Sequence, residues 1–285
     1  MTDTLRFTVL GCASSPGVPR ITGEWGACDP KNPKNRRTRC SLLVERFRKG
    51  GGKEEVTRIV VDTSPDFRQQ MIDAGAQSLD AAIFTHAHAD HIHGIDDLRQ
   101  YAIAQHQRIP VYADTATFGE LAEKFGYIFN SAEGSIYPPI CDWHELKPGK
   151  TTVIEGRGGP VALLPVHQIH GPIHSLGFRF GPVDPETGEL VLSGGLAYSP
   201  DVSDLPPQSA GQLEKLDVWI VDALQYREHI SHFSLAEALD WIARLSPARA
   251  LLTHMHIPLD YATVKNETPD HVEPAYDGLV VELKI

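Results

Sequence analysis

The chain has 285 residues and a formal net charge of −11, because 26 Lys and Arg face 37 Asp and Glu. With 41% hydrophobic and 22% charged residues, its composition is that of a globular protein and excludes an intrinsically disordered chain. It lacks an apolar run of the roughly 20 residues that a membrane span needs. The acidic balance also argues against a protein that coats nucleic acid through a broad basic face.

Short β-rich runs alternate with amphipathic helical patterns along the chain, which is typical of a layered α/β fold. No linker or shift in composition divides the sequence, so we expect a single domain over residues 1–285. We expect strands at Phe7–Leu10, Ser41–Glu45, Arg58–Val61, Ala81–Phe84, Val111–Ala113, Ala162–Val166, Leu176–Phe180, Leu190–Leu192, Val218–Val221 and Ala250–Leu252. We expect helices at Asp66–Ala74, His91–Ala104, Thr115–Phe129, Gln208–Leu216 and Ser234–Leu245.

The first residues and the cysteines bear on the cellular compartment. Met1–Gly11 alternates polar and apolar residues, which predicts a strand and not an export signal. The four cysteines are scattered without any C-x-x-C pair, which predicts free thiols in a reducing compartment. We therefore expect a cytoplasmic protein.

Four of the 14 histidines fall within eight residues, in the string Thr85-His-Ala-His-Ala-Asp-His-Ile-His-Gly94. The string follows a predicted strand and precedes a helical pattern, and open α/β sheets place their sites at such strand ends. His86 and His88 are two residues apart, so in an extended segment they point the same way and can bind one ion. Asp90 and His91 lie at the turn into the helix and can bind a second ion. Because neutral imidazole and carboxylate are the ligands of Zn²⁺ and related ions, the string predicts half of a two-metal site.

The string resembles the T-H-x-H-x-D-H-x-x-G signature of the metallo-β-lactamase superfamily. The resemblance implies an α/β fold of four layers, an αββα sandwich, with a dinuclear metal site along one edge. It also implies that the remaining metal ligands come from later strand ends.

The third histidine of the family has three candidates in the segment Pro165–Phe178, namely His167, His170 and His174. We favour His170, because the sequence that follows it resembles the phosphodiesterase branch of the family. His167 is the alternative.

Two further segments resemble the elements that complete the site. Leu196–Asp201 resembles the element whose carboxylate bridges both ions, which implies that role for Asp201. The segment Ala250–His256 ends a strand on Thr-His, which implies His254 as the last ligand, with His256 as the alternative. One ion would then take His86, His88, His170 and Asp201, and the other Asp90, His91, His254 and Asp201. A set of nitrogen and oxygen ligands suits two Zn²⁺ or Mn²⁺ ions.

His232 precedes a helical pattern and resembles the active-site histidine of the phosphodiesterase and tRNA 3′-processing branches that binds no metal. The resemblance implies that His232 donates a proton, and we expect catalytic roles for it and for Asp90. In the alternative interpretation, His232 only caps the helix together with Ser234.

The predicted centre suits a phosphodiester. Two divalent ions lower the pKa of a water between them and hold a phosphate oxygen. Two carboxylates and a hydroxide leave about one positive charge at the centre in a formal count, which matches a singly negative phosphodiester.

The segment Lys31–Arg39 packs five basic residues into nine positions, and a guanidinium binds phosphate in a bidentate manner. We therefore expect Arg37 and Arg39 to contact substrate, the alternative being a solvated loop with ion pairs. The run Leu10–Pro19 and the segment Asn32–Ser41 resemble the phosphoribosyl 1,2-cyclic phosphate phosphodiesterases. That family's better-known member has a cysteine-rich zinc site after this run, where the present chain retains only Cys28.

Together, these features predict a metal-dependent phosphodiesterase that hydrolyses a small cyclic phosphodiester or a nucleotide-like ester. We expect a small phosphorylated substrate, no membrane contact and no stable complex with nucleic acid, and a homodimer is compatible with the sequence. The alternatives are a tRNA 3′-processing endonuclease, a thioester hydrolase and a non-catalytic accessory protein similar to those of pyrroloquinoline-quinone biosynthesis. The apparently full ligand set favours an enzyme over the accessory protein.

Overall fold

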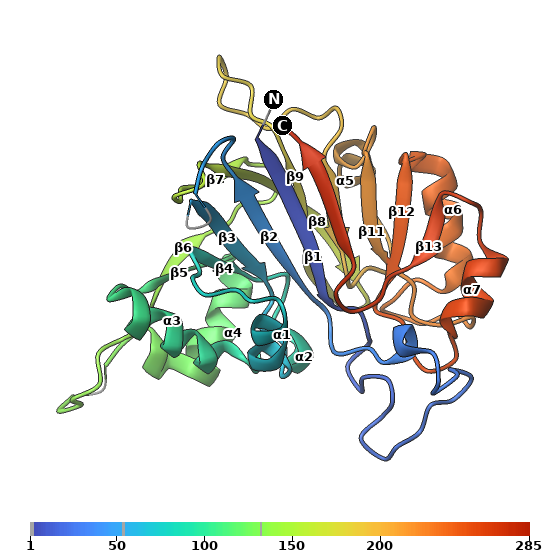
Figure 1. Ribbon diagram of the computed structural model, residues 1–285, viewed down its shortest axis with the longest axis horizontal. Coiled ribbons are helices and arrows are strands. Elements are labelled where there is room, and N and C mark those ends of the chain that lie inside the picture. The colour runs from blue at the N-terminus through green and yellow to red at the C-terminus, as the bar shows by residue number, and fades with distance from the viewer. Residues whose placement is uncertain (1–2, 53–54, 132) are drawn as a thin grey trace.

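The computed structural model describes residues 3–52, 55–131 and 133–285 and shows two mixed β-sheets stacked face to face. Helices cover the outer face of each sheet, so the layers follow the order αββα (Figure 1). The expected sandwich is confirmed.

The first sheet has the strand order β14-β1-β2-β3-β4-β5-β6. Strands β3 to β6 run parallel to one another, whereas β14, β1, β2 and β3 pair antiparallel. Its strands are β1 (Thr4–Gly11), β2 (Ser41–Phe47), β3 (Val56–Val61), β4 (Ala81–Ile83), β5 (Ile109–Ala113), β6 (Cys141–Glu145) and β14 (Val280–Lys284).

The second sheet has the strand order β13-β12-β11-β10-β9-β8-β7. Strands β10 to β13 are parallel, and β7, β8, β9 and β10 pair antiparallel. Its strands are β7 (Thr152–Ile154), β8 (Val161–His170), β9 (Ile173–Gly181), β10 (Leu196–Ser199), β11 (Val218–Asp222), β12 (Arg249–Thr253) and β13 (Val272–Pro274).

The first sheet is flanked by the helices of the first half of the chain and the second sheet by those of the second half (Figure 1). The helices are α1 (Phe67–Asp73), α2 (Ala89–Ile92), α3 (Leu98–Gln105), α4 (Thr115–Phe125), α5 (Pro207–Gln212), α6 (Leu235–Leu245) and α7 (Tyr261–Glu267). Helix α6 begins at a capping box, in which Ser234 and Glu237 each bond the backbone N–H of the other.

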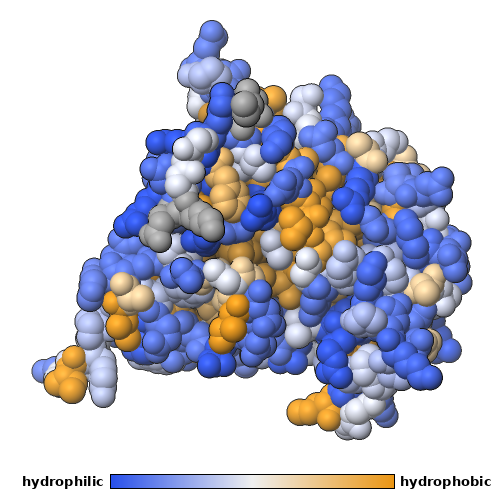
Figure 2. Space-filling model, in the orientation of Figure 1, coloured by the Kyte–Doolittle hydropathy of each residue, from blue (hydrophilic) through white to orange (hydrophobic). Residues whose placement is uncertain are grey.

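Alternation of buried side chains along the strands explains why the sheets stack. In β3, Ile59 and Val61 face the core between the sheets, while Val60 faces the helices on the other side. Across the two sheets Phe7 contacts Phe180, with ring centroids 5.6 Å apart. Figure 2 shows apolar side chains gathered in the middle of the face it presents, with hydrophilic residues around them.

Nine of the expected strands and the helices near 66–74 and 234–245 are confirmed. The strand expected at Leu190–Leu192 is wrong, because Leu190 makes only an isolated bridge with Val183. Strands β6, β7, β10, β13 and β14 were not expected, and neither was helix α7. All five of these strands are only three to five residues long. In β6 and β14 most of the exposed side chains are polar, so the apolar pattern of these strands is weak.

Three expected helices have different bounds. The helix expected at Thr115–Phe129 ends at Phe125 and is followed by a 3-10 turn. The helix expected at Gln208–Leu216 is shorter in the structure, where α5 spans Pro207–Gln212. The helix expected at His91–Ala104 is broken into α2, a 3-10 turn (Ile95–Asp97) and α3. The break lies at Gly94, whose N–H donates to the Thr63 carbonyl at 2.9 Å, and a Cβ there would overlap the Ser64 carbonyl oxygen.

Within the described residues no helix is long and apolar enough to cross a bilayer. Both termini lie at the edge of the sandwich opposite α2 (Figure 1). The histidine string Thr85–Gly94 is therefore at the far end of the fold from the chain ends.

We expect Gly94→Ala to lower the free energy of unfolding by about 1–3 kcal/mol, the usual cost of overpacking, because the added methyl group meets a backbone carbonyl. Gly119→Ala is the matched control: it lies within α4, where an added Cβ meets open space, and should raise the free energy of unfolding by about 0.5–1 kcal/mol. Urea denaturation of the metal-free proteins measures both changes. Equal effects of the two substitutions would contradict the assigned cause of the helix break.

Candidate metal centre

Strands from both sheets end at one edge of the sandwich, and each is followed by a polar side chain. The histidine string Thr85–Gly94 follows β4, and Asp201 lies two residues after β10. Strand β8 ends on His170, β11 ends on Asp222, and His254 follows β12 directly. Because β10, β11 and β12 are parallel, their carboxyl ends meet at this edge, as ligand sites of open α/β sheets do.

The first group of donors comprises His86, His88 and His170, whose candidate ligand atoms lie within 4.8 Å of one another. His88 is the extended residue before α2, and its Nδ1 lies 3.2 Å from His170 Nε2. His86 and His170 are buried, while His88 is exposed. This group therefore opens toward solvent at His88.

The second group comprises Asp90, His91 and His254, which also lie within 4.8 Å of one another. The Asp90 Oδ2 atom is 3.5 Å from His91 Nε2 and 3.7 Å from His254 Nε2. Two adjacent residues of α2 and one residue from the distant strand end are thus brought around a common point.

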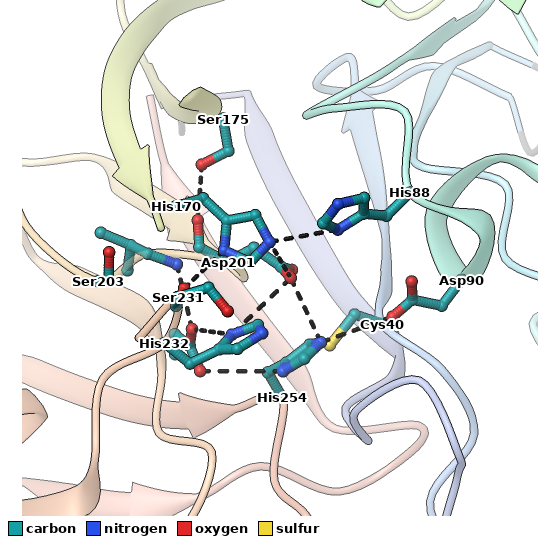
Figure 3. Close-up of polar contacts among 12 residues, drawn as sticks. Cys40, His88, Asp90, His170, Ser175, Asp201, Ser203, Ser231, His232 and His254 are labelled. Carbon is teal, nitrogen blue, oxygen red and sulfur yellow. Dashed lines mark hydrogen bonds and ion pairs between the residues drawn. The ribbon is translucent and has the colours of Figure 1, made fainter. Parts of the chain in front are cut away.

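Asp201 lies between the two groups (Figure 3). Its Oδ2 atom is 3.0 Å from His91 Nε2, and its Oδ1 atom is 3.4 Å from His254 Nε2. The same Oδ1 atom is 3.8 Å from His170 Nε2 and 3.9 Å from His86 Nε2. The structure therefore brings all seven predicted ligands together and places one carboxylate between them.

The donor atoms fit divalent cations. His86 Nε2, His91 Nε2, His254 Nε2 and Asp201 Oδ2 are buried, and none makes a hydrogen bond of normal geometry to a described residue, although His91 Nε2 and Asp201 Oδ2 lie only 3.0 Å apart. A buried polar atom without a partner is costly, and four that face one another would destabilise the fold unless a cation bound them. Imidazole nitrogen and carboxylate oxygen are donors that Zn²⁺ and Mn²⁺ accept.

The protonation of the histidines agrees with this assignment. Burial lowers the pKa of His86 and lowers that of His170 to about 4, so both rings are neutral at pH 7, the form that binds metal. Burial by itself would also lower the pKa of His91, but the carboxylates of Asp201 and Asp90 raise it well above its usual value. The centre therefore stabilises positive charge.

Two residues outside the ligand set orient the imidazoles. Asp62, buried at the end of β3, contacts His91 Nδ1 at 2.7 Å and accepts hydrogen bonds from the backbone N–H and the hydroxyl of Thr85. His170 Nδ1 donates to the Ser231 carbonyl at 2.6 Å. Bonds of this kind fix the tautomer and leave Nε2 available to a metal.

His232 lies beside the centre and forms a pair with a buried carboxylate. Its Nδ1 atom is 2.7 Å from Asp222 Oδ2, and its ring stacks on that of His254 with centroids 4.5 Å apart. Burial lowers the pKa of His232. The cap of α6 is supplied by Ser234 and not by His232, so the alternative interpretation of His232 as a helix cap is wrong.

The alternative histidines lie outside the donor groups. His174 Nε2 contacts Asp114 at 2.8 Å, and its ring stacks on that of His167. His256 contacts Ser14 and Arg20. The geometry therefore favours His170 and His254 over these alternatives.

The predicted substrate residues have other contacts. Arg37 is 1% exposed, and its guanidinium donates to the Leu259 carbonyl at 2.8 Å and to Cys28 Sγ at 3.1 Å. The expectation that Arg37 contacts substrate is therefore wrong, because its donors hold the N-terminal segment to the loop after β12. Arg39 pairs with Asp66 at 2.9 Å, and its substrate contact stays a prediction. Cys28 belongs to none of the candidate metal groups found among the described residues.

Asp62 and Asp222 were not identified from the sequence. Each directly follows a run of apolar strand residues, Ile59–Val61 and Val218–Val221. An acidic residue at the end of an apolar strand is the signal that could have indicated them. Asp62 and His254 also share a positive φ, of 61° and 56°, a strained conformation that clusters at functional sites.

Comparison with known proteins agrees with this geometry. A family model described as a beta-lactamase superfamily domain matches residues 57–255, which include every donor of the two groups. A crystal structure of a new diphosphatase from the PhnP family is 30% identical, with a TM-score of 0.82, over 100% of this chain and 99% of that chain. The chain belongs to the metallo-β-lactamase superfamily.

Solved structures of lower sequence identity share the fold alone. Zn²⁺-bound PqqB from Methylobacterium extorquens is 17% identical with a TM-score of 0.71, over 98% of this chain and 100% of that chain. The short form of human tRNase Z is 14% identical with a TM-score of 0.61, also over 98% and 100%.

One curated relative is longer than the metallo-β-lactamase chain described here. An octanoyltransferase from Porphyromonas gingivalis is 31% identical over 280 residues, which are 96% of this chain and 51% of that protein. The chain thus spans about half the length of this relative.

We expect Asp62→Asn to weaken metal binding about 10- to 100-fold, the usual effect of losing a partner that orients a ligand, because His91 Nδ1 then loses its carboxylate. Competition with a chromophoric chelator measures the affinity. Asp80→Asn is the control, since Asp80 accepts a hydrogen bond from the Arg58 backbone outside the donor groups. Unchanged affinity in Asp62→Asn would show that His91 is oriented by other contacts.

Proposed function

We propose that this protein is a metal-dependent phosphodiesterase in which two divalent ions share Asp201. One observation carries the proposal: six donors, four from the histidine string and two from other strand ends, surround the buried carboxylate of Asp201, and nitrogen atoms without a hydrogen bond to the described residues are directed at it. In this arrangement His86, His88 and His170 would hold one ion, and Asp90, His91 and His254 the other. When bound, the ions supply Lewis acidity and an activated water.

Two residues of the chain, His232 and Asp222, would supply the proton that the leaving group needs. Asp222 holds the Nδ1 proton of His232, which fixes the tautomer and leaves Nε2 as the proton carrier. The oxygen of the attacking water would bond to phosphorus while its proton passes to Nε2, and Nε2 would give that proton to the leaving oxygen as the ester P–O bond breaks. Proton transfer of this kind contributes about 10²- to 10⁴-fold to the rate.

Two observations favour a phosphate ester as the substrate: the charge of the proposed centre and the name of one relative. The carboxylates of Asp90 and Asp201 offset much of the ions' charge, which suits a singly negative phosphate group. The PhnP-family relative is named a diphosphatase, which supports a P–O bond of a phosphodiester or of a diphosphate ester as the reacting bond. A small soluble ester, including a cyclic phosphodiester, is therefore the first substrate class to test.

A second candidate is hydrolysis of an acyl thioester, and one observation favours it, the match to the octanoyltransferase of Porphyromonas gingivalis. That name belongs to a protein about twice as long, so the acyl chemistry can reside in the half that this chain does not match. An octanoyl thioester of pantetheine, tested beside the phosphate esters, separates the two candidates. Cleavage of precursor tRNA in the same panel would support the processing enzyme instead.

We expect metal-loaded protein to bind two ions per chain and to hydrolyse bis(p-nitrophenyl) phosphate, with loss of activity on chelation. Asp201→Ala and His88→Ala should each lower kcat by at least about 10³-fold, because a shared or direct ligand is lost. His167→Ala is the matched control, since His167 lies outside the donor groups. Full activity in both ligand variants would refute the proposal, and one ion or none per active chain would refute the two-ion arrangement.

We expect His232→Gln to retain its metal and to lose activity according to the leaving group. The loss should be about 10²-fold or more for an alkyl ester of a phosphodiester, whose leaving oxygen needs a proton, and much smaller for a p-nitrophenyl ester, whose leaving oxygen does not. Asp222→Asn should show the same leaving-group dependence. Equal losses with both esters would assign the pair a structural role.

A further inference from the structure

The segment between β1 and β2 runs along the same edge of the sandwich as α2 (Figure 1). Within this segment Ala13 pairs with Met255, which places Ser14 beside the residues that follow β12. His256 is two residues beyond the predicted ligand His254, a separation of at most about 7 Å along the chain. The N-terminal segment therefore reaches the neighbourhood of the metal centre.

A chain of hydrogen bonds fixes Arg20 at this point. Arg20 Nη2 lies 2.7 Å from His256 Nε2, and His256 Nδ1 lies 2.8 Å from Ser14 Oγ. Because a guanidinium only donates, Nε2 accepts and Nδ1 carries the proton that goes to the Ser14 hydroxyl. Arg20 Nη1 also pairs with Glu24 at 3.0 Å, within the tight turn Arg20–Glu24. The Arg20 side chain is still 39% exposed, so its remaining donors can reach a ligand.

Most of the other basic residues of the segment are engaged elsewhere. Lys34 donates to Tyr261 and lies over two tyrosine rings, Arg36 lies over Trp25, Arg37 is buried, and Arg39 pairs with Asp66. Arg20 also pairs with a carboxylate, but it differs from these residues because its guanidinium contacts His256, two residues from the predicted ligand His254, and its side chain is partly exposed.

A substrate with two phosphates presents an electrostatic requirement that the centre alone does not meet. Asp90 and Asp201 offset the ions' charge, and the buried carboxylates of Asp62 and Asp222 lie directly behind them. A second anionic phosphate needs a cation outside this group, and a guanidinium binds phosphate oxygens with paired N–H donors.

We infer that Arg20, positioned by His256, binds the non-reacting phosphate of a diphosphate ester and makes the enzyme prefer such esters to simple phosphodiesters. This inference rests on the proposed phosphodiesterase function. Arg20 would select the substrate without contacting the reacting phosphorus, and His256 would be its positioning residue.

The test compares two probes that differ by one anionic phosphate, the methyl ester of adenosine 5′-phosphate and the methyl ester of adenosine 5′-diphosphate. We expect Arg20→Ala to lower kcat/KM at least tenfold for the diphosphate ester, mainly through KM, and less than twofold for the monophosphate ester. Arg20→Lys should recover part of the loss, and His256→Phe should reproduce the same selectivity. Arg36→Ala, which removes a cation from the same segment, is the matched control.

Calorimetry supplies a readout that does not depend on turnover. The non-hydrolysable methylene analogue of the diphosphate ester should bind Arg20→Ala at least tenfold more weakly than the wild type, at equal metal content and with an unchanged unfolding midpoint. Equal losses with both probes, or no loss with the diphosphate ester, would overturn the inference while leaving the phosphodiesterase function intact. A wild-type enzyme that cleaves neither probe nor bis(p-nitrophenyl) phosphate would overturn the function itself, and the inference with it.

Discussion

The structure depends on one constraint, the burial of imidazole and carboxylate groups whose polar atoms make no hydrogen bond of normal geometry to the part of the chain that the structure describes. Protein interiors pair such atoms, because an unpaired one costs free energy. Here several of them surround Asp201, and the strands that carry them come from both sheets. The stacking of the sheets brings these groups together, so in the proposed two-ion centre the cations would complete the interactions that the fold leaves open at one edge.

The residues behind the ligands extend this constraint outward. Asp62 fixes His91 and also bonds Thr85, the first residue of the histidine string, so a single carboxylate orients a ligand and the loop that carries it. Asp222 similarly bonds His232 and lies 3.9 Å from His254 Nδ1. The expected proton donor and the predicted ligand His254 thus share one carboxylate, which couples the position of His232 to that of His254.

The sequence predicts the donors that lie close together in the chain, but it gives little indication of those that come from distant strands. The spacing of His86, His88, Asp90 and His91 is sufficient to predict metal binding, because the extended segment and the following helix turn dictate where these side chains point. The later ligands could be assigned only through family resemblance, since strand order cannot be derived from periodicity.

The prediction that Arg37 contacts substrate was wrong because it rested on composition, whereas the role of this residue depends on its burial. The basic run around Arg37 has the composition of a phosphate-binding loop, yet the Arg37 guanidinium turns inward to the Leu259 carbonyl, which is 222 positions away in the sequence. A contact of this range leaves no local signal. The short strands were not predicted for a related reason. Strands of three to five residues whose exposed side chains are mostly polar, such as β6 and β14, are stabilised by the neighbouring strands with which they pair and have little pattern of their own.

The long-range contacts of the N-terminal segment place the proposed substrate-binding residue and the predicted metal ligands in different parts of the sequence. The family match covers residues 57–255 and carries every candidate metal ligand, whereas the segment that anchors through Arg37 and presents Arg20 lies before it. A centre held by strand ends can be kept while such a segment changes, because the segment contributes contacts to the site without contributing ligands. Solved structures named for a diphosphatase, a tRNase Z and PqqB share the sandwich with this chain, and a shared fold does not by itself define a substrate.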